Sequence, residues 1–152
     1  MYDLYGNPIK NDEIDPSKII LLDLNYTLIS NSGRCSGPYP ERIYQQNYET
    51  ELLDMIKDNY VILITARPER YKDETLKHIK QKTGFEPDES YWNRGMTPPE
   101  IKQYWLTNEI FPKHGDDPRS YYAIESNSNT RRMYSQNGIK SNRKQEIMAK
   151  YK

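Results

Sequence analysis

This sequence has only one cysteine, no long apolar run and no excess of one charge. Its single cysteine, Cys35, cannot form a disulfide within the chain, which is typical of a protein from a reducing compartment. No run approaches the ~18 apolar residues of a membrane span, and the N-terminus has neither the basic nor the apolar region of a signal peptide. We therefore expect a cytoplasmic protein that does not interact with membranes.

The charge balance excludes nucleic-acid binding by bulk charge. Lysine plus arginine and aspartate plus glutamate number 22 each, so the formal net charge is zero and only a local basic patch could serve. The chain is 35% hydrophobic with a mean hydropathy of -1.03, which indicates a largely polar surface. A length of 152 residues predicts a single domain over 1–152, with a polar N-terminal segment over 1–18 and a basic tail, or a basic helix, over 140–152.

Tyrosine dominates the aromatic residues, with 14 tyrosines against 2 phenylalanines and 2 tryptophans. Tyrosine rings can serve as stacking platforms for nucleic-acid bases. Nothing in the sequence groups them on one face, so the simpler interpretation is that they are amphipathic residues at the edge of the core.

Hydrophobic patterning predicts strands that alternate with helices. Short apolar runs with β-branched residues predict the strands, and i+4 stripes with terminal Pro and Gly signals predict the helices. The expected strands are 18–24, 60–64, 88–92, 120–124 and a short one from Ile139; the expected helices are 41–58, 69–82, one opened by Pro98, and 128–137.

Two of these helices have specific signals. The first has a stripe at i+4 spacing, formed by Tyr44, Tyr48, Leu52 and Ile56. In the third, Thr97 and Glu100 fit a capping box. Its inward-facing residues are expected to be Ile101, Trp105 and Ile110.

The element order predicts an α/β fold, a three-layer sandwich with a central parallel sheet. In such sheets the site lies beyond the carboxyl ends of the strands. At this edge, three of the predicted strands are followed by polar residues, directly after the apolar run of the strand. They are Asp23 and Asn25, Thr65 and Arg67, and residues 125–129.

These segments resemble, in order, the four signatures of the haloacid dehalogenase-like phosphatase superfamily, over about 19–139. Residues 20–28 (Ile-Leu-Leu-Asp-Leu-Asn-Tyr-Thr-Leu) are similar to motif one, which has the pattern Asp-x-Asp-x-Thr-Leu. Residues 64–68 are similar to motif two, Lys102 stands where motif three has its lysine, and residues 122–129 parallel motif four, commonly Asp-Asp-x-x-Asn. The stretch 98–139 most resembles the 3′-phosphatase domain of phage polynucleotide kinase.

The resemblance implies a Mg²⁺-dependent phosphatase that acts through an aspartyl-phosphate. Asp23 would be the nucleophile, Thr65 and Lys102 would bind the phosphate, and Arg67 would contact the substrate. Mg²⁺ would be bound by Asp23, the backbone carbonyl of Asn25 and Glu125, since it prefers oxygen ligands.

The family's cap domains have no room in this sequence, because 28–60 and 66–101 hold only short elements. The resemblance therefore implies a capless, open site whose substrate is a phosphorylated nucleic-acid end or a nucleotide. Arg34, Arg42 and Arg70 would bring positive charge to its mouth. The Lys-, Asn- and Tyr-rich composition is typical of a low-GC genome such as a phage.

Two residues depart from the family pattern. Asn25 replaces the acid/base aspartate of motif one, although an amide cannot transfer that proton and a positioned acid/base contributes ~10²–10⁴-fold. Glu125 and Ser126 replace the paired aspartates of motif four, which weakens the metal site.

Three explanations of Asn25 stay open. It could be a deliberate substitution, the mark of a catalytically silent module that binds phosphate or nucleic acid, or a sign that another group is the acid. The candidates for that group are Tyr26, His78 and His114. A metal-free dehalogenase is a weaker interpretation, because those enzymes need a cap. The sequence does not encode the exact substrate or the oligomeric state.

Overall fold

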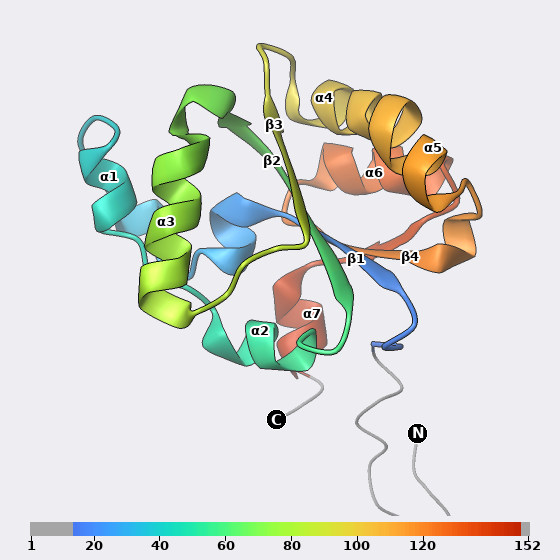
Figure 1. Cartoon of the computed structure of the whole chain (residues 1–152), viewed down its shortest axis with the longest axis horizontal. Helices are drawn as coiled ribbons and strands as arrows, with labels where there is room; N and C mark the ends of the chain where they lie inside the picture. The colour runs from blue at the N-terminus through green and yellow to red at the C-terminus, as the bar shows by residue number, and fades with distance from the viewer. Residues whose placement is uncertain (1–13, 150–152) are drawn as a thin grey trace, which may run out of the picture.

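A computed structural model describes residues 14–149, which form a five-stranded parallel sheet with helices on both faces (Figure 1). The strand order is β3-β2-β1-β4-β5, so the first strand lies in the centre. The strands are β1 Ile19–Leu22, β2 Tyr60–Pro68, β3 Glu89–Asn93, β4 Tyr121–Ile124 and β5 Lys140–Asn142. This confirms the predicted α/β fold.

The helices cover the two faces of the sheet in separate layers (Figure 1). They are α1 Glu41–Tyr44, α2 Thr50–Met55, α3 Lys72–Thr83, α4 Pro98–Trp105, α5 Phe111–His114, α6 Ser128–Gln136 and α7 Lys144–Ala149. Within β1, Ile20 and Leu22 pack in one core with residues of α2, α3 and α7, and Leu21 packs in the other core with residues of α4 and α6. The strand is buried on both faces, which is why its sequence is continuously apolar.

The predicted helix over 41–58 is wrong, because the chain forms two short helices with an irregular stretch between them. In that stretch Tyr48 forms an isolated antiparallel bridge with Ile29, and the Glu49 N–H donates to the Leu28 carbonyl. The segment after β1 therefore takes the backbone groups that a continuous helix would use. Tyr44 is 60% exposed, so the predicted stripe does not lie on one buried face.

The helix α4 differs from prediction only at its start. Ile101, Trp105 and Ile110 are buried as expected. The Thr97 hydroxyl does not cap the helix backbone but donates to the Glu100 carboxylate at 2.7 Å. The predicted capping box is therefore absent, and Pro98 begins the helix.

The segment predicted as a basic tail or helix is folded in its described part, where it forms a strand and a helix. Residues 140–142 form strand β5, which pairs with β4, and α7 follows it. Ile147 on α7 is 1% exposed and packs in the core with Ile20 and Leu52. Apolar residues at Ile147 and Met148 therefore dock a segment that charge alone marked as solvated.

The N-terminal segment is described only from Ile14 onwards. Ile14 is buried in the core on the α7 side of the sheet, so this end of the predicted polar segment is not wholly solvated. The rest of the segment lies outside the described residues, as does the end of the predicted tail. Within 14–149, no helix has the length and apolar character needed to cross a bilayer.

In the phosphatase superfamily that the sequence resembles, cap domains are inserted in two segments of the chain. The corresponding segments of this protein hold only short elements. Residues 23–59 contain α1, α2 and tight turns, and residues 69–97 contain a turn, α3 and β3. Across the described range the chain builds no second sheet and no separate helical bundle (Figure 1). The carboxyl ends of the strands are therefore left without a cap.

We predict that Ile147→Ala destabilises the protein by about 2–5 kcal/mol, because it leaves a cavity in the core beneath α7. Thermal or denaturant unfolding measures the change. Gln145→Ala on the exposed side of the same helix is the matched control and is expected to stay within about 0.5 kcal/mol of the unsubstituted protein. Equal stability of the two variants would mean that α7 does not dock.

Candidate active site

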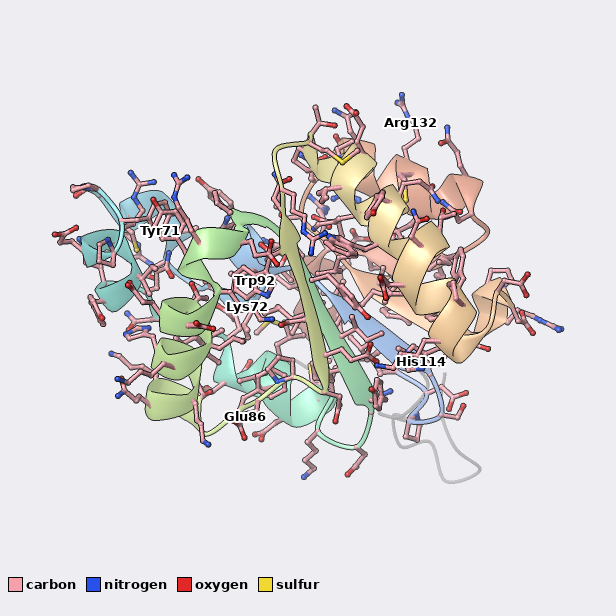
Figure 2. All side chains as sticks on the ribbon, turned by 45° about the horizontal axis from the view of Figure 1, so that its top comes forward. Tyr71, Lys72, Glu86, Trp92, His114 and Arg132 are labelled. Atoms are coloured by element: carbon pink, nitrogen blue, oxygen red, sulfur yellow. The ribbon has the colours of Figure 1, made fainter. Side chains whose placement is uncertain are left out.

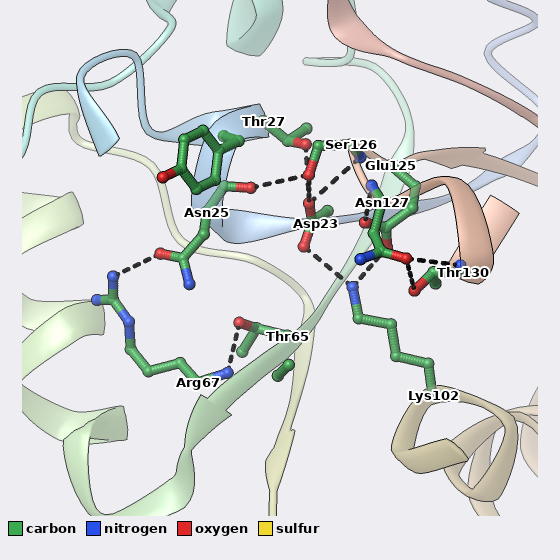
Figure 3. Close-up of polar contacts among 12 residues, drawn as sticks. Asp23, Asn25, Thr27, Thr65, Arg67, Lys102, Glu125, Ser126, Asn127 and Thr130 are labelled. Atoms are coloured by element: carbon green, nitrogen blue, oxygen red, sulfur yellow. Dashed lines mark hydrogen bonds and ion pairs between the residues drawn. The ribbon is translucent and has the colours of Figure 1, made fainter. Parts of the chain in front are cut away.

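Three charged side chains meet at the carboxyl ends of β1 and β4 (Figure 3). Asp23 follows β1, Glu125 follows β4, and Lys102 projects from α4. The Lys102 Nζ lies 3.0 Å from Asp23 Oδ1 and also forms an ion pair with Glu125 Oε1. The exposed fractions are 6% for Asp23, 1% for Lys102 and 2% for Glu125. One buried cation therefore neutralises two buried carboxyl groups, the arrangement in which charge burial is tolerated.

The second oxygen of Asp23 is held by two hydroxyl groups. Thr27 Oγ1 donates to Asp23 Oδ2 at 2.9 Å, and Ser126 Oγ donates to the same oxygen at 2.8 Å. Thr27 reaches back because Tyr26 turns the chain at φ +60°, a conformation that tyrosine rarely adopts. The Tyr26 N–H donates to Ser32 Oγ at 2.8 Å, which fixes this turn. Strain at Tyr26 is thus coupled to the position of the Asp23 carboxylate.

The surroundings push the pKa values of the two carboxyl groups apart. Burial raises the pKa of Asp23, but attraction to Lys102 and the hydrogen bonds that Asp23 accepts outweigh burial and lower it overall. For Glu125, burial raises the pKa to about 7, opposed by Lys102 and helped by the negative charge of Asp23. Burial lowers the pKa of Lys102, but the two carboxylates outweigh burial and raise it overall. Asp23 is therefore the more readily ionised of the two carboxyl groups, as a nucleophile requires.

A second group of contacts forms in the last part of β2, beyond the residues that pair with β1. The Thr65 hydroxyl oxygen accepts from the Arg67 backbone N–H at 3.0 Å. Arg67 Nη1 donates to Thr75 Oγ1 and Nη2 donates to Asn25 Oδ1, each at 2.9 Å. Arg67 is 1% exposed, and its Nε has no hydrogen-bond partner in the described part of the chain. This buried guanidinium holds the amide of Asn25 away from the ion triad (Figure 3).

The predicted site residues therefore fall into two linked sets. Asp23, Lys102 and Glu125 are in direct contact, and Asn25 contacts Arg67. The Ser126 hydroxyl joins the sets, because it lies 2.8 Å from Asp23 Oδ2 and 3.2 Å from the Asn25 carbonyl oxygen. Figure 3 shows Thr65 at the end of β2 on the Lys102 side of Arg67, with its hydroxyl directed to the Arg67 backbone.

Several supporting residues were not predicted. Thr27 was visible as a motif-one residue but was given no role, and Thr75 had no signal because its partner is eight residues distant on another element. Arg131 Nη1 donates to the carbonyls of Glu125 and Ser126 at 3.1 and 2.7 Å, which fixes the loop that follows β4. These contacts depend on tertiary structure, so residue spacing alone does not reveal them.

The donor atoms for a divalent cation lie on two sides of Asp23. Asp23 Oδ2 and the Asn25 carbonyl oxygen face the same Ser126 hydroxyl, so they surround a common point. Glu125 instead contacts Lys102 with one oxygen, and its other oxygen accepts from the Asn127 N–H at 3.1 Å. No group of three or more acidic, histidine or cysteine side chains suited to a metal occurs within residues 14–149. Only two protein oxygens therefore face one point, so a Mg²⁺ ion held there would have to keep most of its water.

The three alternative acids lie in different places. His78 is buried and pairs with the Tyr48 hydroxyl through Nδ1 at 2.6 Å. His114 pairs with Glu89 at the amino end of β3, the opposite edge of the sheet. Tyr26 is 59% exposed and lies between Asn25 and Thr27 in the site turn. Only Tyr26 among the three is located beside Asp23.

We predict that Lys102→Met destabilises the protein by about 3–5 kcal/mol at neutral pH, because it leaves two buried carboxyl groups without their cation. The loss should shrink as pH falls, since the carboxyl groups then take up protons and no longer need a countercharge. Denaturant unfolding at several pH values measures both effects.

Two further variants test the origin of this loss. Lys77→Met removes an exposed lysine from α3 and should change stability by less than about 0.5 kcal/mol. Adding Glu125→Gln to Lys102→Met should recover part of the lost stability, because it removes one of the unpaired charges. A Lys102→Met penalty that is small and independent of pH would contradict the buried triad.

Comparisons with known proteins give a match of fold. No family model matches the chain, and no curated protein matches it by sequence. Among solved structures, a chain in the structure of the Pnkp1/Rnl/Hen1 RNA repair complex is similar, with a TM-score of 0.64 and 20% identity. The match covers 84% of this chain and 42% of that chain, so this chain spans less than half of its length. At this identity the likeness establishes a shared α/β fold.

Proposed function

We propose that this protein is a phosphohydrolase that removes a phosphate from a nucleic-acid 3′ end or a nucleotide. The observation that carries the proposal is the Lys102–Asp23 contact at 3.0 Å, with Thr27 and Ser126 holding the other carboxylate oxygen. A carboxylate oriented by three donors and kept ionised is suited to attack phosphorus. Similarity to a chain from an RNA repair complex supports a nucleic-acid substrate.

The proposed reaction has two displacements at phosphorus. An Asp23 oxygen forms a bond to phosphorus, and the bond from phosphorus to the 3′ oxygen breaks, which leaves an aspartyl-phosphate and an alcohol that takes its proton from water. Water then attacks the same phosphorus, releases inorganic phosphate and restores Asp23. Lys102 and the Thr65 hydroxyl would bind the phosphoryl oxygens, and Arg67 would contact the substrate from the end of β2.

Mg²⁺ is the proposed cofactor. Asp23 and the Asn25 carbonyl would bind it, and Glu125 would become a ligand on release from Lys102. When bound, the cation supplies positive charge that stabilises the phosphoryl group. The Ser126 hydroxyl stands between the first two oxygens, within hydrogen-bond distance of both, and its single proton is closer to Asp23.

Asn25 favours a second candidate function, a catalytically silent module that binds phosphate or nucleic acid. Its amide accepts from Arg67 at 2.9 Å and has no ionisable proton for the leaving oxygen. Ser126 removes a further carboxylate from the cation site. A protein with these two changes could keep a phosphate pocket without turnover.

The first test is phosphate release from a 3′-phosphorylated oligonucleotide in Mg²⁺. The protein should release phosphate slowly, and Asp23→Ala should abolish release because it removes the nucleophile. A matched 5′-phosphorylated oligonucleotide checks which end is used. No release, with the oligonucleotide still bound, would reject the phosphatase and leave the silent module.

Asn25→Asp tests the consequence of the amide. An aspartate there would supply the ionisable carboxyl group that Asn25 lacks. Once it leaves Arg67 for the leaving oxygen, turnover should rise by about 10²-fold or more, the scale of a positioned acid/base. Asn25→Gln is the matched control, because it changes size without adding a carboxyl group. An unchanged rate in Asn25→Asp would show that the amide does not limit catalysis.

A further inference from the structure

A stack of tyrosine and arginine side chains lies beside the candidate site. The rings of Tyr39 and Tyr71 are stacked with centroids 4.4 Å apart. Arg42 lies 5.0 Å from the Tyr39 centroid, and Arg70 lies 4.8 Å from the Tyr71 centroid. Tyr39 comes from the loop before α1 and Tyr71 from the turn before α3, and Figure 2 shows Tyr71 at that end of α3. Stacking thus gathers cations from two separate segments.

The arginines of this stack have no acidic partners. None of the ion pairs formed by residues 14–149 includes Arg42, Arg67 or Arg70. The Arg42 Nε donates only to the Gly37 carbonyl, and Arg70 makes no hydrogen bond among the described residues. Their remaining N–H groups are available to phosphate oxygens. In a chain with balanced charge, the guanidinium groups of Arg42 and Arg70 supply the local basic patch that nucleic-acid binding requires, whereas Arg67 is 1% exposed and lies beneath them.

The stack is connected to the reacting centre through Arg67. This guanidinium lies 5.3 Å from the Tyr39 centroid, and its Nη2 donates to Asn25 in the site. A path therefore runs from Asp23 through Arg67 and Tyr39 to Tyr71 and Arg70. Neither Arg42 nor Arg70 contacts Asp23 or Lys102 among the described residues, so the stack extends the site outwards and is suited to a ligand with several phosphates in a row.

We propose that this Tyr39–Tyr71–Arg42–Arg70 stack binds the single strand that precedes the reacting 3′-terminal phosphate. Guanidinium edges would contact the phosphates. The tyrosine rings stack on each other and under the arginines, so the outer guanidinium planes are the flat faces offered to unstacked bases. A duplex end keeps its bases stacked on each other and cannot use those faces. The inference rests on the proposed function for its orientation, because the terminal phosphate is placed at Asp23.

The test is equilibrium binding, measured by fluorescence anisotropy in the Asp23→Ala protein so that the ligand is not consumed. The ligands are a 3′-phosphorylated mononucleotide and a 3′-phosphorylated single strand of about ten nucleotides, a typical single-strand site size. The strand should bind more tightly than the mononucleotide. Arg42→Gln with Arg70→Gln should reduce that advantage about tenfold. The same pair should also reduce the log–log salt dependence of strand binding by about 0.7 for each phosphate that is no longer neutralised.

Arg119→Gln with Lys57→Gln is the matched control. Both residues are exposed and precede strands, Arg119 before β4 and Lys57 before β2, so they lie at the opposite edge of the sheet. Their replacement subtracts two positive charges without touching the stack. The control should keep the full advantage of the strand over the mononucleotide. An equal loss in the control would mean that only net charge matters, and equal affinity for a blunt duplex would mean that base stacking is not used. Either result overturns the proposal.

Failure of the stack and failure of the phosphatase give different results. If the protein releases 3′-phosphate but strand affinity does not depend on Arg42 and Arg70, the stack proposal alone is wrong. If strand affinity depends on both arginines but no phosphate is released, the phosphatase proposal alone is wrong and the stack belongs to a binding module.

Discussion

The site depends on one buried lysine placed between two carboxyl groups. Lys102 neutralises Asp23 and Glu125 at the point where the central strands end, and all three side chains are almost fully buried. Without that cation, two carboxyl groups could not both stay ionised in this environment. The helix α4 must therefore pack closely on the sheet, and its buried Ile101 and Trp105 provide that packing. Fold stability and site chemistry consequently share the same side chains.

The central strands and their polar ends could be predicted because their signals are local. A continuous apolar run at β1 indicates burial on both faces, and parallel strands bring the residues that follow them to one edge. The break between α1 and α2 could not be predicted, because Ile29 and Tyr48 pair only once the chain is folded. The docking of α7 was missed for a similar reason. Its one fully buried residue, Ile147, lies in a short helix that begins with Lys-Gln-Glu, and the charge of this segment hid the apolar residues that dock it.

Within the candidate site, residue identity was more predictable than residue contact. The sequence marked Asn25 as a departure from an acid/base pattern, but its pairing with Arg67 follows from the geometry of the β2 end. Ser126 was seen as the loss of a charge, and the structure shows its hydroxyl bridging Asp23 and the Asn25 carbonyl. The two departures therefore act together. At position 25, Arg67 holds the amide of asparagine away from the triad. At position 126, the serine hydroxyl places a hydrogen-bond donor where the Asp23 and Asn25 oxygens converge.

The abundance of tyrosine has two physical explanations in this fold. Tyr121 and Tyr134 are fully buried in the core that α4 and α6 share, which agrees with their use as core residues. Tyr39 and Tyr71 differ, because each stacks on the other and each has a guanidinium group over its ring. The sequence could not show that these two tyrosines lie on one face, since they come from segments that are distant along the chain. Once the sheet brings the segments together, the same residue type supports the core in one place and organises unpaired positive charge in another.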